Sequence, residues 1–127
     1  MKIYNSTKTD IDTILNGHIE KLELTIGGEF VISLNNGYYL VLSDFTMCCE
    51  TRYMVCYDPD LRYFLGSKII KFTESPIKYL QDSQTNHEIC FVTIHTNIGT
   101  IDLVNHNSHN GCYSGFDLNI TIMDKLQ

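Results

Sequence analysis

The sequence lacks the features that mark several classes of protein. It contains no tryptophan and only two prolines, and none of its apolar runs approaches the ~20 residues that a membrane-spanning helix needs. Residues 1–30 do not show the basic, apolar and small-residue succession of a secretory signal. We therefore expect a cytoplasmic protein that makes no contact with a membrane.

Positive charge is also scarce. Nine lysines and arginines stand against fifteen aspartates and glutamates, which gives a net charge of −6, and the basic residues are scattered along the chain. Binding to a phosphate backbone requires a clustered excess of lysine and arginine. We therefore expect no direct contact with nucleic acid.

The five cysteines do not follow the spacing of a disulfide framework or of a zinc knuckle. Their number is odd, and the adjacent pair Cys48 and Cys49 cannot easily bridge to itself. Reduced thiols in a cytosol are the simplest account of this pattern. Cys56 and Cys90 fall within expected strands, where each is interpreted as a small apolar core residue.

What the chain does contain favours strands. Eight tyrosines and six phenylalanines accompany many isoleucines, valines and threonines, and such side chains pack well on a pleated surface. A length of 127 residues corresponds to about one domain, which we expect to span residues 1–127. Neither a repeat nor a low-complexity tract interrupts it.

Alternating apolar and polar residues predict a series of strands joined by short turns. Gly27-Gly28 and Asn35-Asn36-Gly37 supply two hairpin turns, because glycine and asparagine tolerate positive φ. The segments expected as strands are 19–26, 30–34, 38–43, 53–57, 68–72, 89–96, 100–104 and 113–123, the last with Phe116, Leu118, Ile120 and Ile122 on one face.

Two short helices are expected between these strands. Thr9 or Asp10 caps a single turn that ends at Gly17, and Asp58 caps a second helix that ends at Gly66. The polar stretches 44–51, 74–88 and 105–111 are interpreted as loops. The order of elements predicts a mainly β (α+β) fold, a curled or partly closed antiparallel sheet with one short covering helix.

Metal binding and catalysis are two functions that the polar loops could serve. His106, His109 and Cys112 are spaced by three, and the adjacent cysteines could complete a tetrahedral site. Adjacent cysteines point to opposite sides of an extended chain, however, so no metal ligand and no cofactor is predicted.

A cysteine nucleophile would need an accessible thiolate with a histidine base nearby, and His95, His106 or His109 could supply that base. Glu50 beside Cys49 disfavours the thiolate, and phosphate loops and nucleophile elbows are missing from the sequence. We therefore predict no catalytic residues and expect a protein that is not an enzyme.

Recognition of a partner is the remaining interpretation. Tyrosine gives rigid contact area with a polar tip, and arginine gives a forked donor, so both are enriched in protein interfaces. The predicted binding residues belong to the cysteine loop, the strand after it, the second helix and the late polar turn: Cys48, Cys49, Glu50, Arg52, Tyr53, Arg62, His109, Asn110, Tyr113 and Ser114.

Three of these stretches, in this order, resemble a family of small phage-encoded domains without a settled function. They are Cys48-Cys49-Glu50, Leu61-x3-Leu65-Gly66-Ser67 and Asn110-Gly111-Cys112-Tyr113-Ser114, and the resemblance runs from His18 to Ile122. Members typically carry a Cys-Cys-Glu loop and a late Asn-Gly-Tyr-Tyr-Ser segment. Here Cys112 replaces the first of those tyrosines, and Phe91 stands alone where the family has a Trp-Phe-Tyr group. The resemblance implies phage or prophage origin and a β-rich fold without known catalytic residues.

Small acidic phage proteins without catalytic motifs resemble counter-defence factors, which suggests three functions. The first is stoichiometric inhibition of a host immune protein, in the manner of an anti-CRISPR protein. The second is a sponge that sequesters a nucleotide-derived immune signal, with Arg52 or Arg62 on phosphates. Because the chain has only these two arginines, such a pocket would require a homo-oligomer. The third is a phage housekeeping role.

Overall fold

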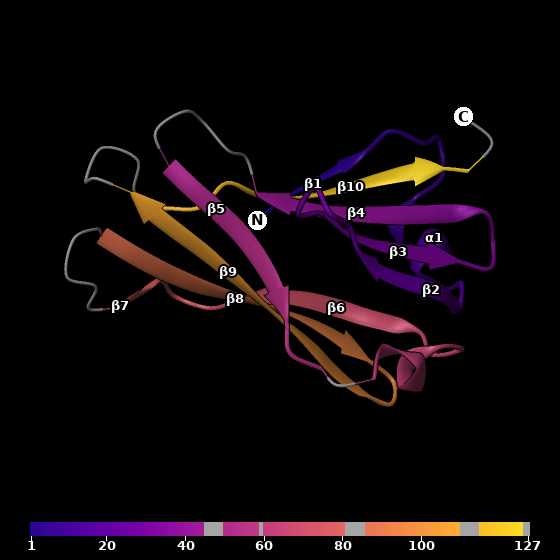
Figure 1. The fold of residues 1–127 in the computed structure, drawn as a ribbon. Helices are drawn as coiled ribbons and strands as arrows, with labels where there is room; N and C mark the ends of the chain where they lie inside the picture. Colours follow the sequence, from indigo (N-terminus) through magenta and orange to yellow (C-terminus); the bar gives the residue numbers. More distant parts are fainter. Residues whose placement is uncertain (45–49, 59, 81–85, 110–114, 126–127) are drawn as a thin grey trace.

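The computed structural model describes residues 1–44, 50–58, 60–80, 86–109 and 115–125, with the backbone but not the side chain of Glu50. Its strands form two sheets that face each other and do not close into a barrel (Figure 1). The elements in chain order are β1 (Lys2–Asn5), α1 (Ile11–Leu15), β2 (Ile19–Leu24), β3 (Phe30–Leu34), β4 (Tyr38–Asp44), β5 (Glu50–Cys56), the 3₁₀ helix η1 (Leu61–Phe64), β6 (Ile69–Glu74), β7 (Lys78–Leu80), β8 (Asn86–Thr96), β9 (Gly99–His109) and β10 (Leu118–Asp124).

The first sheet, sheet A, has the strand order β1-β10-β4-β3-β2. Strands β2, β3 and β4 form the meander that the two turn signals predicted, and Gly37 has the positive φ of 92° that its hairpin turn requires. The last strand, β10, runs antiparallel to β4, and β1 adds to β10 in parallel. Sheet A therefore unites the two ends of the described chain.

The second sheet, sheet B, has the strand order β5-β9-β8-β6, with β7 paired to β8 beyond the end of β6. Its centre is a hairpin of two eleven-residue strands, β8 and β9, which pair in one continuous register from Asn86–His109 to Thr96–Gly99. Because side chains alternate between the faces of a strand, the even-numbered residues of β8 and the odd-numbered residues of β9 point toward sheet A.

The core fills the space between the sheets. Ile14 of α1 and Phe64 of η1 close two of its margins. Its twelve largest fully buried side chains come from α1 and both sheets: Phe30, Ile14, Ile19, Ile32, Leu34, Leu40, Leu42, Ile94, Ile101, Leu103, Ile120 and Ile122. The predicted shared face of Leu118, Ile120 and Ile122 is buried in this core, and Phe116 packs against it.

The predicted mainly β class is confirmed, and Asp10 caps α1 through a side-chain bond from the backbone N–H of Thr13. The second helix was predicted too long and with the wrong cap. It is a four-residue 3₁₀ helix capped by Asp60, whose carboxylate accepts from the backbone N–H of Arg62. Asp58 instead accepts from the backbone N–H of Asp102 on β9. Asp58 is thus bound to β9, and Asp60 is the cap.

Two polar segments that were interpreted as loops contain strands. Residues 105–109 continue β9, and residues 78–80 form β7. β1 was not predicted either. β1 and residues 105–109 pair with strands distant in sequence, β10 and β5, whereas β7 pairs with β8, the next strand. Sequence patterns predict such strands poorly, because a strand that is held by its neighbours need not show alternating apolar and polar residues. The helices among the described residues are too short to cross a membrane.

At one end of sheet B, the ends of three strands lie side by side. His109 of β9 is in register with Glu50 of β5 on one side and with Asn86 of β8 on the other. Figure 1 shows these ends diverging from sheet A, at the left of the view. We call residues 50–54, 86–90 and 105–109 the splayed end. Residues 50–51 and 105–109, which the sequence predicts to lie in two separate loops, are therefore on neighbouring strands.

We expect the core to respond strongly to a cavity in sheet B. Ile94 is 0% exposed, whereas Ile70 of β6 is 61% exposed. Replacing Ile94 by alanine should lower the free energy of unfolding by about 2–5 kcal/mol through lost burial and the remaining cavity. The matched change Ile70→Ala should cost no more than about 0.5 kcal/mol. Urea denaturation of both variants checks this, and equal costs would contradict the assigned faces.

Candidate functional site at the splayed end

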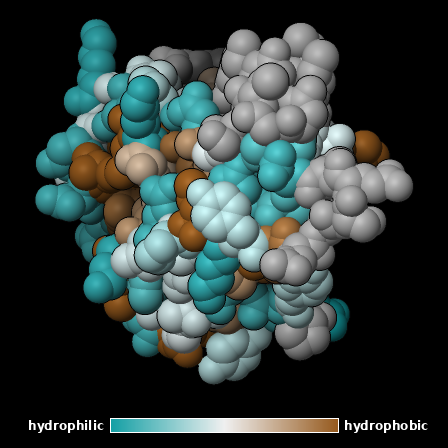
Figure 2. Space-filling model, turned by 90° about the vertical axis from the view of Figure 1, so that its left-hand side faces the viewer, coloured by the Kyte–Doolittle hydropathy of each residue, from teal (hydrophilic) through white to brown (hydrophobic). Residues whose placement is uncertain are grey.

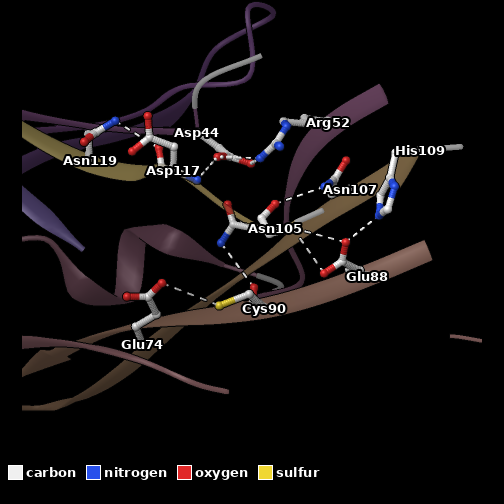
Figure 3. Close-up of polar contacts among 11 residues, drawn as sticks. Asp44, Arg52, Glu74, Glu88, Cys90, Asn105, Asn107, His109, Asp117 and Asn119 are labelled. Atoms are coloured by element: carbon white, nitrogen blue, oxygen red, sulfur yellow. Dashed lines mark hydrogen bonds and ion pairs between the residues drawn. The ribbon is translucent and has the colours of Figure 1, made fainter. Parts of the chain in front are cut away.

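The inner face of the splayed end buries a carboxylate. Glu88 of β8 is 1% exposed, and its Oε1 accepts from Nε2 of His109 at 2.5 Å. The backbone N–H of Gly115 also reaches it, at 3.2 Å from Oε1 and 3.3 Å from Oε2 (Figure 3). His109 and Gly115 border residues 110–114 on either side, so one carboxylate holds both ends of that segment.

A second buried carboxylate has the same role for another segment. Both oxygens of Asp44, at the end of β4, accept from an Nη1 of Arg52 at 3.1 Å, and Oδ1 also accepts from the backbone N–H of Asp117 at 2.8 Å. Burial raises the pKa of Asp44, and the Asp117 N–H and the Arg52 guanidinium oppose that rise. Asp44 thus joins sheet A, β5 and the segment before β10.

Two asparagines on the inner face of β9 complete the polar cluster. Asn107 donates from Nδ2 to the carbonyl of Gly115 at 3.0 Å, and Asn105 donates from Nδ2 to the carbonyl of Cys90 at 3.2 Å. Neither side chain is more than 1% exposed. Among the described residues, Oδ1 of Asn105 has no hydrogen-bond partner. A buried amide left half satisfied costs stability, so this position is a candidate for a functional contact.

The outer face of the splayed end carries a cluster of aromatic rings. Tyr53 of β5 stacks on His106 of β9, with ring centroids 4.4 Å apart and planes 6° apart. Nδ1 of His106 hydrogen-bonds Nε2 of His87 on β8 at 2.9 Å. Burial, and secondly the charge of His87, lower the pKa of His106 below its ordinary value. A hydrogen-bonded pair of imidazoles therefore lies on this face, with a tyrosine stacked on one of them.

The structure separates the predicted binding residues. Tyr53 lies on the outer face and is 44% exposed, whereas His109 and Arg52 point inward and are buried. Arg62 lies on η1, away from the splayed end, where Asp60 accepts from its guanidinium. Glu50 starts β5 next to His109. Five predicted residues lie outside the described residues: Cys48, Cys49, Asn110, Tyr113 and Ser114.

The candidate metal ligands are also divided. His106 and His109 are an odd number of residues apart on one strand, so they face opposite sides of sheet B. The third candidate, Cys112, lies outside the described residues. Within the described ranges, no group of three or more histidine, cysteine, aspartate or glutamate side chains could hold a metal ion.

Sequence reasoning missed three residues that build the site: Glu88, Asn107 and His87. The signal for Glu88 was present in the alternation of β8, because Cys90, Val92 and Ile94 share its face. Extending that period by one step would have placed a carboxylate in the interior. Because charged residues are rarely buried, the sequence favours a solvent-facing position for Glu88.

The inner cluster is best suited to holding segments in place. Glu88 and His109 point at each other, and their side chains are 1% and 4% exposed. In the described part of the chain, the burial of both groups gives them no access to solvent. The outer cluster instead presents aromatic and polar atoms outward. No protein family model matches the sequence, and no curated protein or solved structure is significantly similar to it.

We expect loss of the Glu88 charge to destabilise the fold. The change Glu88→Gln should lower the free energy of unfolding by about 3 kcal/mol, because it leaves buried His109 without its charged partner. Glu29 is exposed in the turn before β3, so Glu29→Gln should change stability by about 0.5 kcal/mol or less. Chemical denaturation measures both. Equal stability of Glu88→Gln and the parent would show that the carboxylate does not hold the cluster together.

The His106 imidazole should make stability depend on pH. Its folded-state pKa lies below the ordinary 6.5, so between these two values the unfolded chain binds more protons. The stabilisation that depends on neutral His106 is therefore complete above pH 6.5 and is lost as the pH falls through the folded-state pKa. His106→Gln should remove this part of the dependence of stability on pH. His95 of β8 lies on the same outer face of sheet B, and His95→Gln should keep that dependence. Melting curves from pH 7.5 to pH 5 test this, and an unchanged slope in His106→Gln would contradict it.

Proposed function

We propose that this chain is a non-enzymatic binding protein that docks a partner protein on the outer face of sheet B. The observation that carries the proposal is an outward-facing set of apolar and aromatic residues on three adjacent strands. We call it the outer patch, and its members are Tyr53 and Val55 of β5, Val104 and His106 of β9, and Ile89 and Phe91 of β8. Tyr53 is exposed, Val104 is buried among its neighbours, and the other four are half-buried.

The outer patch is more apolar than the outward face of a two-layered sheet protein normally is. The solvent-facing side of an antiparallel sheet is normally polar, and the outward residues of β3 and β4 include Ser33, Tyr39 and Ser43. On sheet B, the directly paired rows Ile89–His106–Tyr53 and Phe91–Val104–Val55 are instead apolar or aromatic. Lys78 lies 5.6 Å above the Phe91 ring and gives the patch a charged margin.

The molecular surface agrees with a transient interface rather than a permanent one. Figure 2 shows apolar side chains exposed in separate places among hydrophilic ones, without one continuous apolar face. Non-obligate interfaces have this mixed composition, with tyrosine enriched at their centres. The 44% exposure of Tyr53 fits it for such a central contact.

The partner we propose is a bacterial immune protein, which the chain would inhibit stoichiometrically during infection by a phage or from a prophage. This part of the proposal rests on the resemblance to phage-encoded domains and on the acidic charge of −6. An acidic surface favours association with basic partners. Effectors that handle nucleic acid carry basic surfaces, which is the chemistry we expect opposite the outer patch.

The nucleotide sponge receives no support from the described side chains. Arg52 is buried against Asp44, and Arg62 donates to Asp60 from two guanidinium nitrogens. A phosphate would have to displace a carboxylate at either position. We therefore keep inhibition by docking as the proposed function.

The test begins with bacterial strains that each carry one defined immune system. Expression of the chain should restore plating of a targeted phage in one strain, and the purified immune protein should then form a fixed-stoichiometry complex with it. Tyr53→Ser should weaken that complex by about tenfold or more. Tyr63→Ser is the matched control, because Tyr63 on η1 is 64% exposed and should change affinity by about twofold or less.

Other outcomes would contradict the proposal in distinct ways. An intact nucleotide released from the heat-denatured protein would favour the sponge. Equal losses of affinity in Tyr53→Ser and Tyr63→Ser would place the interface elsewhere. Failure to restore plating in any strain, together with no bound nucleotide, would favour a housekeeping role. Circular dichroism of both variants checks that they are folded.

A further inference from the structure

The two sheets have four lateral edges, and three of them are protected against pairing with another chain. β1 is only four residues long. β2 has a register shift between Ile19 and Lys21, and the first of these is already paired outward, to Gly66 and Ser67 at 2.7 and 2.8 Å. β6 has a register shift between Ile69 and Lys71. Short strands, bulges, charges and covering segments are the usual means of blocking an edge.

β5, which borders sheet B on its other side, is longer than β1 and has no register shift. Its seven residues pair with β9 in unbroken register from Glu50–His109 to Cys56–Leu103. It contains neither lysine nor proline. No backbone hydrogen bond from any other described residue reaches its free side. A long, regular edge with which no described residue pairs is a template for another strand.

The side chains of β5 make this edge suited to pairing. Its one arginine, Arg52, points inward to Asp44 and is 9% exposed, so it does not guard the edge. The outward positions are occupied by Thr51, Tyr53 and Val55, and β-branched and aromatic residues make favourable cross-strand pairs. Strand pairing here would extend the outer patch without a break.

We propose that two copies of this chain associate through antiparallel pairing of β5 with β5, about a two-fold axis at Tyr53. The sequence of β5 is self-complementary in that register. Tyr53 meets Tyr53 of the second copy, and Thr51 meets Val55 twice. Like charges are nowhere directly opposed, because Glu50 faces Cys56 and Arg52 faces Met54. A closed two-fold interface of this kind uses the same surface on both copies.

This association goes beyond the proposed function, since it concerns the chain alone and its edge rather than the face that a partner would cover. It joins two sheets into one of eight main strands and places both outer patches on the same continuous surface. Because each copy carries a charge of −6, long-range repulsion opposes the dimer. Added salt screens that repulsion, so the dimer should strengthen as ionic strength rises.

Analytical ultracentrifugation of the purified chain tests the proposal. The 14.6 kDa monomer should convert to a species of twice that mass as the concentration rises to about 100 μM, because self-association follows mass action. The double change Thr51→Lys with Val55→Lys puts lysine opposite lysine at two places. It should weaken dimerisation by about tenfold or more. The control Val31→Lys with Ser33→Lys, at outward positions of the internal strand β3, should leave dimerisation unchanged.

A second variant with the opposite charges makes the test independent of folding defects. Chains with Thr51→Glu and Val55→Glu should also be monomeric alone. Mixed with the lysine variant, they should form a one-to-one heterodimer, because each lysine then faces a glutamate. A monomer at all concentrations would overturn the proposal. So would a dimer that survives the lysine changes, or a mixture that fails to pair. None of these three results affects the partner test, since that test scores binding to an immune protein.

Discussion

Strict alternation along the β8–β9 hairpin is the constraint on which the rest of the structure depends. Two eleven-residue strands pair without a shift in register, so each side chain is assigned to one face of sheet B. Over most of the hairpin this rule delivers Val92, Ile94, Ile101 and Leu103 to the core. The same rule continues to the splayed end, where it delivers polar side chains to the interior. A one-residue slip would reverse every assignment.

The buried polar side chains follow from that rule and are stabilised by what they hold. A carboxylate in the interior is unfavourable unless it is paired and hydrogen-bonded. Glu88 meets this requirement through His109 and Gly115, and Asp44 meets it through Arg52 and Asp117. Each carboxylate thereby joins segments that are distant in the chain. The interior polar cluster thus positions the ends of segments that alternation alone would leave unconnected.

On the opposite face, the same alternation creates the surface available for recognition. Tyr53, His106 and Ile89 point outward because Met54, Asn105 and Cys90 point inward. The tyrosine ring stacks on His106, which hydrogen-bonds His87, and the row ends at β5, the edge strand of sheet B. Face and edge therefore meet at Tyr53, which connects the binding of a partner with self-association through one side chain.

The sequence by itself determined the features that depend on neighbouring residues. These are the β-rich class, the β2–β4 meander with its glycine turns, the cap at Asp10 and the buried face of Leu118, Ile120 and Ile122. Among the predicted binding residues, Tyr53 is exposed, whereas Arg52 and His109 point inward. Both are polar residues whose partners, Asp44 and Glu88, lie in other strands.

Tertiary structure alone decided which polar residues became interior, which aspartate capped η1, and that residues 105–109 extended β9. Local signals report turn chemistry and periodicity because both act over a few residues. The pairing of Glu88 with His109 or of Asp58 with the Asp102 backbone joins residues 21 and 44 positions apart. The first of these contacts is buried between the two sheets and the second lies at the surface, and both depend on strand pairing that no short stretch of sequence contains.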